Sequence, residues 1–198
     1  PRLWAKAKGI NDSIAVKTAN FIMDTAVYSS AHVIVMEKLD LKGRKHGSKK
    51  QRLHHWRARY VQQMVEDKAH RNGRRVSRVC ARNTSKLAFD GSGAVTRDEK
   101  NHSLCTFQNG KRYNCDLSAS YNIGARYFVR EIFKSLSVTM GQRIAAKVPE
   151  CVKRSTCTLS SLLRLHAELG STEHQLSECS PHRTEAVPPI TNEGSLRL

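Results

Sequence analysis

The chain opens with a helical repeat of apolar and polar residues that gives way to a short apolar run. Over residues 11–30, apolar and threonine side chains recur at intervals of three and four, which predicts an amphipathic helix capped by Asn11 or Asp12. Residues 33–36 (VIVM) then begin with three β-branched side chains, which favours a strand covered on both faces. A helix that leads into such a strand indicates an α/β sheet.

A basic, glycine-punctuated segment follows and leads into a second helical pattern. Residues 43–51 (GRKHGSKKQ) predict a loop, because glycine breaks regular structure and the other residues are polar. Residues 52–73 carry an apolar stripe at helical spacing, and Gly73 stands where a C-terminal cap belongs. The alternating stretch 74–81 predicts a second strand, with Val76 and either Val79 or Cys80 pointing inward.

Residues 81–114 are polar and rich in turn signals. The sequences DGSG at 90–93 and QNGK at 108–111 are typical of tight turns, so we predict an irregular insertion with one or two hairpins. Three further helices are predicted after it, at residues 118–136, 139–147 and 158–169.

Gly124 lies inside the first of these helices. Glycine there costs about 1 kcal/mol relative to alanine, which points to a close packing contact.

Beyond the last predicted helix, the composition changes to Ser, Thr, Glu and Pro, and we expect disorder from about residue 171. We therefore divide the chain into a main unit, residues 1–150, and a divergent, partly disordered tail, residues 151–198.

The net charge of +17 is concentrated in one stretch. Between residues 42 and 86, fifteen Lys and Arg accompany only two acids, Glu66 and Asp67, whereas residues 151–198 hold five of each kind. A basic stretch of this density is typical of proteins that bind nucleic acid, through attraction to phosphate and release of counterions. The chain has no long apolar run and no apolar signal-peptide core, so we expect neither a membrane span nor secretion. Without secretion, the cysteines are expected to be reduced.

Two carboxylates stand where a metal site can be built. Glu37 ends the first predicted strand, beside the crevice that open sheets leave, and Asp116 opens a helix whose positive dipole end favours its charge. Mg²⁺ prefers carboxylate oxygens, and paired metal ions promote phosphodiester cleavage. From the pattern alone, a solvated residue that opens a loop is the favoured interpretation of Glu37, and a helix cap is the favoured interpretation of Asp116.

Two segments resemble a known family. HVIVMEKLDLKG, and CDLSASYNIGARYF about eighty residues later, resemble the C-terminal half of the TnpB (OrfB-type) proteins of bacterial transposons, relatives of the type V CRISPR effectors. The resemblance covers roughly residues 11–136 and implies a RuvC-like nuclease domain of RNase H-like fold. It also implies that Glu37 and Asp116 are the second and third catalytic carboxylates and bind Mg²⁺ or Mn²⁺. The third family motif, D-x-N-A-A-x-N-I, is matched by Asp116, Ala119, Asn122 and Ile123, with Ser118 and Ser120 in place of its first Asn and second Ala.

The resemblance is incomplete at the N-terminal side. In the family the first carboxylate lies on an upstream strand in a G-I-D-x-G setting, and separate domains hold a guide RNA. Residues 9–12 (GIND) lead straight into the first predicted helix, so Asp12 is expected to cap it. With two of three carboxylates, the isolated chain is expected to be inactive, either as a fragment of a longer protein or as a decayed copy.

The zinc ribbon of the family is also altered. The family carries T-S-x-x-C-x-x-C and a second C-x-x-C before the third motif, whereas this chain keeps Thr84 and Ser85 but has Ala88 at the first cysteine position. The remaining candidates for a weak zinc site are Cys80, Cys105 and Cys115, with His102 as a fourth ligand. They lack the paired spacing of tetrahedral zinc sites, so buried or free thiols are the favoured prediction.

The fold class predicted is α/β: a partial RNase H-like sheet with flanking helices, a degenerate ribbon-like insertion and a flexible tail. We predict that DNA and a guide RNA contact Arg44, Lys45, Lys49, Lys50, Arg52, Arg57, Arg59, Arg74 and Arg75. Three functions remain open: the nuclease half of a TnpB-like endonuclease in the bacterial cytoplasm near the nucleoid, a non-catalytic nucleic-acid-binding protein, and a small basic structural protein such as a ribosome-associated one.

Overall fold

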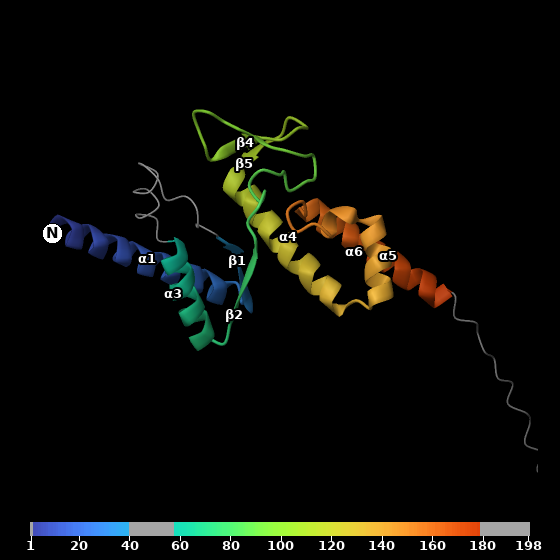
Figure 1. Ribbon diagram of the computed structural model, residues 1–198, viewed down its shortest axis with the longest axis horizontal. Helices are drawn as coiled ribbons and strands as arrows, with labels where there is room; N and C mark the ends of the chain where they lie inside the picture. Colours follow the sequence, from blue (N-terminus) through green and yellow to red (C-terminus); the bar gives the residue numbers. More distant parts are fainter. Residues whose placement is uncertain (1, 40–57, 179–198) are drawn as a thin grey trace, which may run out of the picture.

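The computed structural model describes residues 2–39 and 58–178, with side chains described as far as residue 171 (Figure 1). This part of the chain is a mixed α/β structure, which confirms the predicted class. Its elements in chain order are α1 (Arg2–Tyr28), β1 (Val33–Lys38), α3 (Ala58–Arg71), β2 (Arg75–Cys80), β3 (Thr96–Arg97), β4 (Leu104–Thr106), β5 (Arg112–Asn114), α4 (Cys115–Ser135), α5 (Val138–Lys147), a 3₁₀ turn η1 (Pro149–Cys151) and α6 (Leu159–Glu178). None of the helices in the described ranges is long and apolar enough to cross a membrane.

Strands β1 and β2 pair in parallel, from Val33 opposite Arg75 to Lys38 opposite Cys80. Parallel neighbours need a crossover, and α3 lies on the segment that connects them. Helices α1 and α3 cover one face of this pair and α4 covers the other (Figure 1). The prediction of a strand covered on both faces is therefore confirmed, while the partial RNase H-like sheet stays a prediction.

The core on the α1 and α3 face follows from residue size. Ala19 of α1 and Ala69 of α3 are fully buried, and their small side chains let the two helices approach. Met23 and Val65 fill the space between the helices, and the strand residues Ile34, Met36 and Val76 pack against this cluster. The inward position of Val76 is confirmed. Val79 is three residues further along the strand, so strand alternation places its buried side chain on the opposite face of the sheet.

Helix α1 begins at Arg2, nine residues earlier than expected. Asn11 and Asp12 therefore lie inside the helix, and the prediction that one of them caps it is wrong. Ala and Lys alternate in the preceding stretch of the sequence, and both are strong helix formers, so the helix extends through residues that bury little.

Helix α3 ends as predicted. Gly73 adopts φ +66°, the amide of Gly73 donates to the carbonyl of His70 at 3.1 Å, and the amide of Arg74 donates to that of Ala69 at 2.8 Å. This is the left-handed cap that glycine favours. The loop predicted at 43–51 and the first residues of the predicted helix lie outside the described residues.

The insertion forms a small antiparallel sheet in the order β3, β4, β5. Both predicted turns are present: the Asp90 carboxylate accepts from the amide of Ser92 at 3.0 Å, and the Asn109 side chain accepts from the amide of Lys111 at 3.1 Å. Gly110 supplies the positive φ, +82°, that the second turn requires.

Helices α4, α5 and α6 share a separate hydrophobic cluster. Its buried members are Val129, Ile144, Val148, Cys151, Cys157 and Leu165. The chain after residue 150, expected as a tail, thus contributes to this core, and α6 extends to Glu178 rather than 169. Phe128 of α4 is 56% exposed, and its ring contacts that of Tyr127.

Gly124 makes no close packing contact, contrary to expectation, because a Cβ atom built there meets no atom within 4 Å. Gly124→Ala should therefore raise the free energy of unfolding by about 0.5–1 kcal/mol, the cost of glycine in a helix. Gly73→Ala is the matched control and should lower it by about 1 kcal/mol, since alanine tolerates a positive φ poorly. Urea denaturation of both variants measures the difference, and destabilisation by Gly124→Ala would show a contact that we do not see.

Candidate carboxylate metal site

Glu37 is part of β1 and lies opposite Val79 of β2. Its carbonyl accepts from the side-chain amide of Gln62 at 2.9 Å, and its half-buried carboxylate accepts from the hydroxyl of Thr84. Glu37 is therefore held by both its backbone and its side chain. The alternative of a solvated residue that opens a loop is wrong.

Thr84 reaches Glu37 because the chain turns sharply after β2. Asn83 adopts φ +64°, a left-handed conformation that Asn tolerates better than most residues. Thr84 is 2% exposed, so its hydroxyl meets the carboxylate in a largely dry environment. The threonine that the sequence motif retains thus orients one oxygen of the candidate ligand.

Asp116 is the second residue of α4 and is not its cap. Asn114 is the cap, and its side-chain oxygen accepts from the amides of Asp116 and Leu117, both at 2.9 Å. The alternative of Asp116 as a helix cap is therefore wrong. Its exposed carboxylate stands at the positive end of the helix dipole, where a metal ligand is electrostatically stabilised.

Asn122 ties the helix of Asp116 to the segment that holds Glu37. Its fully buried side-chain nitrogen donates to the carbonyls of Thr84 at 3.0 Å and Leu87 at 2.8 Å. Its side-chain oxygen accepts from the amide of Leu159, the first residue of α6, at 3.2 Å. The Asn122 amide group thus joins three segments.

One turn further along α4, Arg126 is 5% exposed and donates to four backbone carbonyls. These are Cys157 at 3.2 Å, Cys80 at 2.5 Å, Arg82 at 2.8 Å and Ser155 at 3.1 Å. Burial lowers the pKa of Arg126 below its ordinary value, and nearby groups that include Glu37 act in the opposite direction. The negative charge of the Glu37 carboxylate therefore favours the charged form of the buried Arg126 guanidinium.

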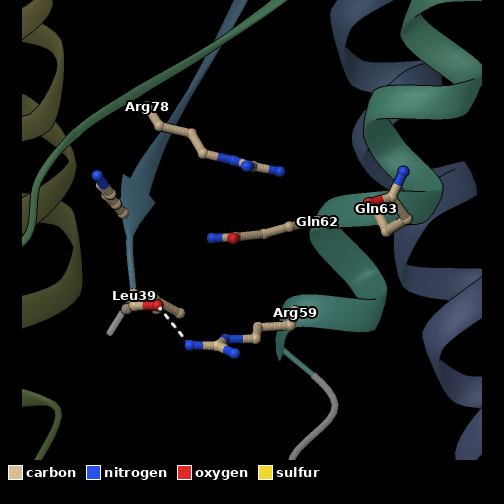
Figure 2. A pocket seen from close by; sticks show the side chains of 6 residues that line it. Leu39, Arg59, Gln62, Gln63 and Arg78 are labelled. Atoms are coloured by element: carbon tan, nitrogen blue, oxygen red, sulfur yellow. Dashed lines mark hydrogen bonds between the residues drawn. The ribbon is translucent and has the colours of Figure 1, made fainter. Parts of the chain in front are cut away.

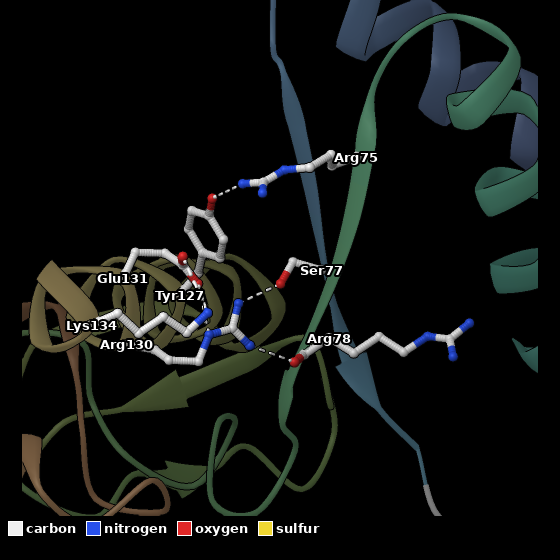
Figure 3. Close-up of polar contacts among 7 residues, drawn as sticks. All are labelled: Arg75, Ser77, Arg78, Tyr127, Arg130, Glu131 and Lys134. Atoms are coloured by element: carbon white, nitrogen blue, oxygen red, sulfur yellow. Dashed lines mark hydrogen bonds and ion pairs between the residues drawn. The ribbon is translucent and has the colours of Figure 1, made fainter.

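Further contacts fix α4 on the sheet (Figure 3). The guanidinium of Arg130 donates to the hydroxyl of Ser77 at 2.5 Å and to the carbonyl of Arg78 at 3.1 Å. Arg75, predicted to bind nucleic acid, donates to the hydroxyl of Tyr127 at 3.3 Å.

The other predicted nucleic-acid contacts are divided between described and undescribed residues. Arg74 lies partly buried and donates to the carbonyls of Ala31 at 3.0 Å and Asn72 at 3.2 Å, so its guanidinium has a structural role. Arg59, on the first turn of α3, donates to the carbonyl of Leu39 at 3.5 Å. The remaining six lie outside the described residues: Arg44, Lys45, Lys49, Lys50, Arg52 and Arg57.

Among the described residues, the three candidate cysteines are not gathered at one site. Cys80 lies in β2, whereas Cys105 and Cys115 are buried in the insertion with Ala88 and Phe107. Burial, and next a hydrogen bond with Cys115, raise the pKa of Cys105 to about 11, which disfavours the thiolate that a metal binds. In the described ranges, no group of three or more His, Cys, Asp or Glu side chains is placed to hold a metal ion.

Three residues of this network were missed as functional by the sequence analysis. Thr84 was noted only as a retained motif residue, Asn122 only as a motif match, and Arg126 not at all. The signal that identifies Asn122 and Arg126 is a row of polar residues along the buried side of an otherwise apolar helix, at Ser118, Asn122 and Arg126, four residues apart.

These features define a mixed α/β protein with two candidate metal-binding carboxylates, supported by a buried hydrogen-bond network. No protein-family model matches the chain. It is 31% identical over 131 residues to a TnpB-like protein of Aquifex aeolicus (strain VF5), an alignment that covers 61% of this chain and 42% of that protein. The chain is therefore related to TnpB-like proteins, as the two motifs suggested, and it spans less than half the length of this relative.

Replacement of Arg126 by Met should lower the free energy of unfolding by about 3 kcal/mol, because buried carbonyls lose their donors. Arg126→Lys keeps the charge but not the forked geometry and should recover only part of the loss. Chemical denaturation of both variants measures this. If Arg126→Met were as stable as the parent chain, the guanidinium network would contribute nothing.

The insertion is expected to be stable without zinc, because aromatic packing holds it. Phe107 is 2% exposed, and its ring centroid lies 5.6 Å from that of Phe89. Phe107→Ala should cost about 3 kcal/mol, while incubation of the parent chain with a chelator should leave the melting temperature unchanged. Calorimetry with zinc analysis checks both, and a chelator-induced drop with stoichiometric zinc would contradict the prediction.

Proposed function

We propose that this chain is the C-terminal nuclease half of a TnpB-like, RNA-guided DNA endonuclease of the bacterial cytoplasm. The observation that carries the proposal is the similarity to a TnpB-like protein over 131 residues. The oriented carboxylate of Glu37 and the exposed carboxylate of Asp116 support it, because neither is explained by the structural roles first considered.

The donor set fits Mg²⁺ or Mn²⁺. Both side chains supply carboxylate oxygens, and Mg²⁺ is commonly held by one or two carboxylates together with water and substrate phosphate. When bound, such an ion would polarise the phosphodiester and activate water. In this arrangement Thr84 holds one oxygen of Glu37, the α4 dipole stabilises the charge of Asp116, and Asn122 keeps the two segments together.

The proposal includes the absence of activity in the chain by itself. The resemblance implies a third carboxylate on an upstream strand, and Asp12, the nearest candidate, lies within α1. Two carboxylates provide less charge and less geometric constraint than three, so metal affinity and cleavage are expected to require the remainder of the larger protein.

A second candidate function is non-catalytic binding of DNA or RNA. The net charge of +17 favours it, since attraction to phosphate does not require the carboxylates. In this alternative the chain keeps the surface that binds nucleic acid and has lost cleavage.

Two measurements on the purified chain test the proposal: Mn²⁺ binding, followed by paramagnetic resonance, and cleavage of labelled single-stranded DNA with Mg²⁺, Mn²⁺ or EDTA. We expect weak Mn²⁺ binding that Glu37→Gln and Asp116→Asn each reduce at least about tenfold, because each removes one anionic ligand. Glu99→Gln, an exposed carboxylate of the insertion, is the matched control and should bind Mn²⁺ like the parent chain. No cleavage is expected from any of the four proteins.

The outcomes separate the candidates. If both variants bound Mn²⁺ as well as the parent chain does, Glu37 and Asp116 would be excluded as metal ligands. Non-catalytic binding of DNA or RNA would then be the better supported of the two functions. Metal-dependent cleavage that both variants abolish would support the two carboxylates but contradict the inactivity of the isolated chain. Because Glu37 also stabilises buried Arg126, each variant is first compared with the parent chain by thermal denaturation.

A further inference from the structure

Helix α1 carries a row of large, exposed apolar side chains along one face, which we call the α1 stripe. Its members are Leu3, Ile10, Ile14, Phe21 and Tyr28, each between 52% and 93% exposed. At 100° per residue, they fall within about 40° of arc around the helix axis. Their spacing of seven, four, seven and seven residues is typical of a helix that packs along its length against another helix.

The α1 stripe faces away from the core of the protein. The buried side chains of the helix lie about 160° around the axis from it, and they are Ala15, Ala19, Met23 and Ala26. Of these, Ala19 and Met23 pack against α3. Toward its N-terminus, α1 also extends beyond α3 (Figure 1). The described core therefore leaves the stripe uncovered.

The stripe is separate from the hollow between β1 and α3. Gln62 of α3 and Arg78 of β2 point into that hollow, and none of the described residues that line it belongs to α1 (Figure 2). The lining of the hollow is largely polar, whereas the stripe is apolar. An apolar partner is therefore matched by the stripe and not by the hollow.

Two threonines border the stripe on one side, and their hydroxyls already have acceptors. Thr18 donates to the carbonyl of Ile14 at 2.9 Å, and Thr25 donates to that of Phe21 at 2.8 Å. A hydroxyl that is removed from water without a partner costs free energy, but these two keep theirs within the helix. This border can therefore be covered at little cost.

The opposite border carries charges in a definite order. Lys6 lies near the N-terminal end of α1 and Asp24 near its C-terminal end, both exposed and at the same angle around the axis. If two copies of the helix pair antiparallel about a twofold axis, Lys6 of each copy meets Asp24 of the other. A parallel pair would instead bring each charge against its own kind. The order of charges thus matches a second, antiparallel copy of the same helix.

The same alignment also matches the apolar side chains. With the twofold axis at about residue 15, Leu3 lies opposite Tyr28 of the other copy, and Ile10 lies opposite Phe21. From Leu3 to Tyr28 the stripe is about 37 Å long at 1.5 Å per residue. Charge order and apolar alignment therefore select the same arrangement.

We propose that the α1 stripe is the interface of a homodimer in which the α1 helices of two copies of this chain pair antiparallel. Such a dimer needs neither the carboxylates nor nucleic acid, so it lies beyond the proposed function. One residue opposes it. Lys17 continues the seven-residue spacing of Leu3 and Ile10, and the two copies of Lys17 meet near the twofold axis, where their like charges limit the affinity.

The test is sedimentation velocity of the full chain over a wide range of concentrations around the micromolar scale, where small interfaces typically dissociate. Ile14→Glu and Phe21→Glu should each raise the Kd of the dimer at least about tenfold, because each places two carboxylates in an apolar interface. Val138→Glu is the matched control, since Val138 is an exposed apolar residue of α5, and it should dimerise like the parent chain. Lys17→Leu should lower the Kd, a gain that loss of folding cannot produce.

A charge exchange tests the direction of the helices. Lys6→Glu and Asp24→Lys should each raise the Kd by about three- to tenfold, because each replaces two attractive pairs by two repulsive ones. The double variant should restore the affinity of the parent chain. Circular dichroism of all variants verifies that they are folded.

A parent chain that is monomeric at every concentration would overturn the proposal, and the stripe would then be a surface for a different polypeptide. A dimer that Ile14→Glu, Phe21→Glu and Lys17→Leu leave unchanged would also overturn it, because the interface would lie elsewhere. If the single charge variants weakened the dimer and the double variant did not recover, the antiparallel arrangement would be wrong. None of these results bears on metal binding or cleavage, so the proposed function stands or fails separately.

Discussion

The guanidinium of Arg126 determines how the elements of this protein are joined. Burial of a cation is expensive, and here four backbone carbonyls solvate it in place of water. Two of these carbonyls lie at and just after the end of β2, at Cys80 and Arg82, and two lie before α6, at Ser155 and Cys157. One side chain of α4 therefore connects the parallel strands, the start of the insertion and the C-terminal helices. The position of Glu37 depends on this arrangement, because the turn that carries Thr84 begins at the same carbonyls.

The third motif has two kinds of residue with separate tasks. Asn122 is fully buried and all its polar atoms face protein groups, so its identity is explained by folding. Ala119 is 9% exposed, and its small side chain suits the packed side of the same helix. Asp116 lies exposed on the first turn, and within the described ranges no side-chain hydrogen bond or ion pair of its carboxylate is seen. The buried positions of the motif are therefore explained by folding, whereas Asp116 is the position to which the proposed function assigns a chemical role.

The sequence pattern predicted elements that depend on local physics. The cap at Gly73, the turns at 90–93 and 108–111 and the strand at 33–36 each follow from backbone preference or side-chain alternation over a few residues. The predicted start of α1 was wrong because Asp12 is a residue type that often caps helices. The strong helix formers that precede it extend the helix to Arg2 instead. Arg126 could not be predicted, because its partners are carbonyls about thirty and forty-five residues away in sequence. A carbonyl has no sequence signature, so such contacts become visible only in the folded chain.

Neighbouring residues of β1 lie on opposite faces of the sheet. The carboxylate of Glu37 accepts from Thr84, whereas Lys38, the next residue, lies on the other face by strand alternation. Attraction to phosphate needs only positive charge and accessible donors, and it tolerates changes in geometry that metal-ion chemistry does not. In the proposed function, attraction to nucleic acid would therefore survive the loss of one metal-binding carboxylate. The two proposed properties, coordination of a metal ion and attraction to phosphate, thus depend on different side chains.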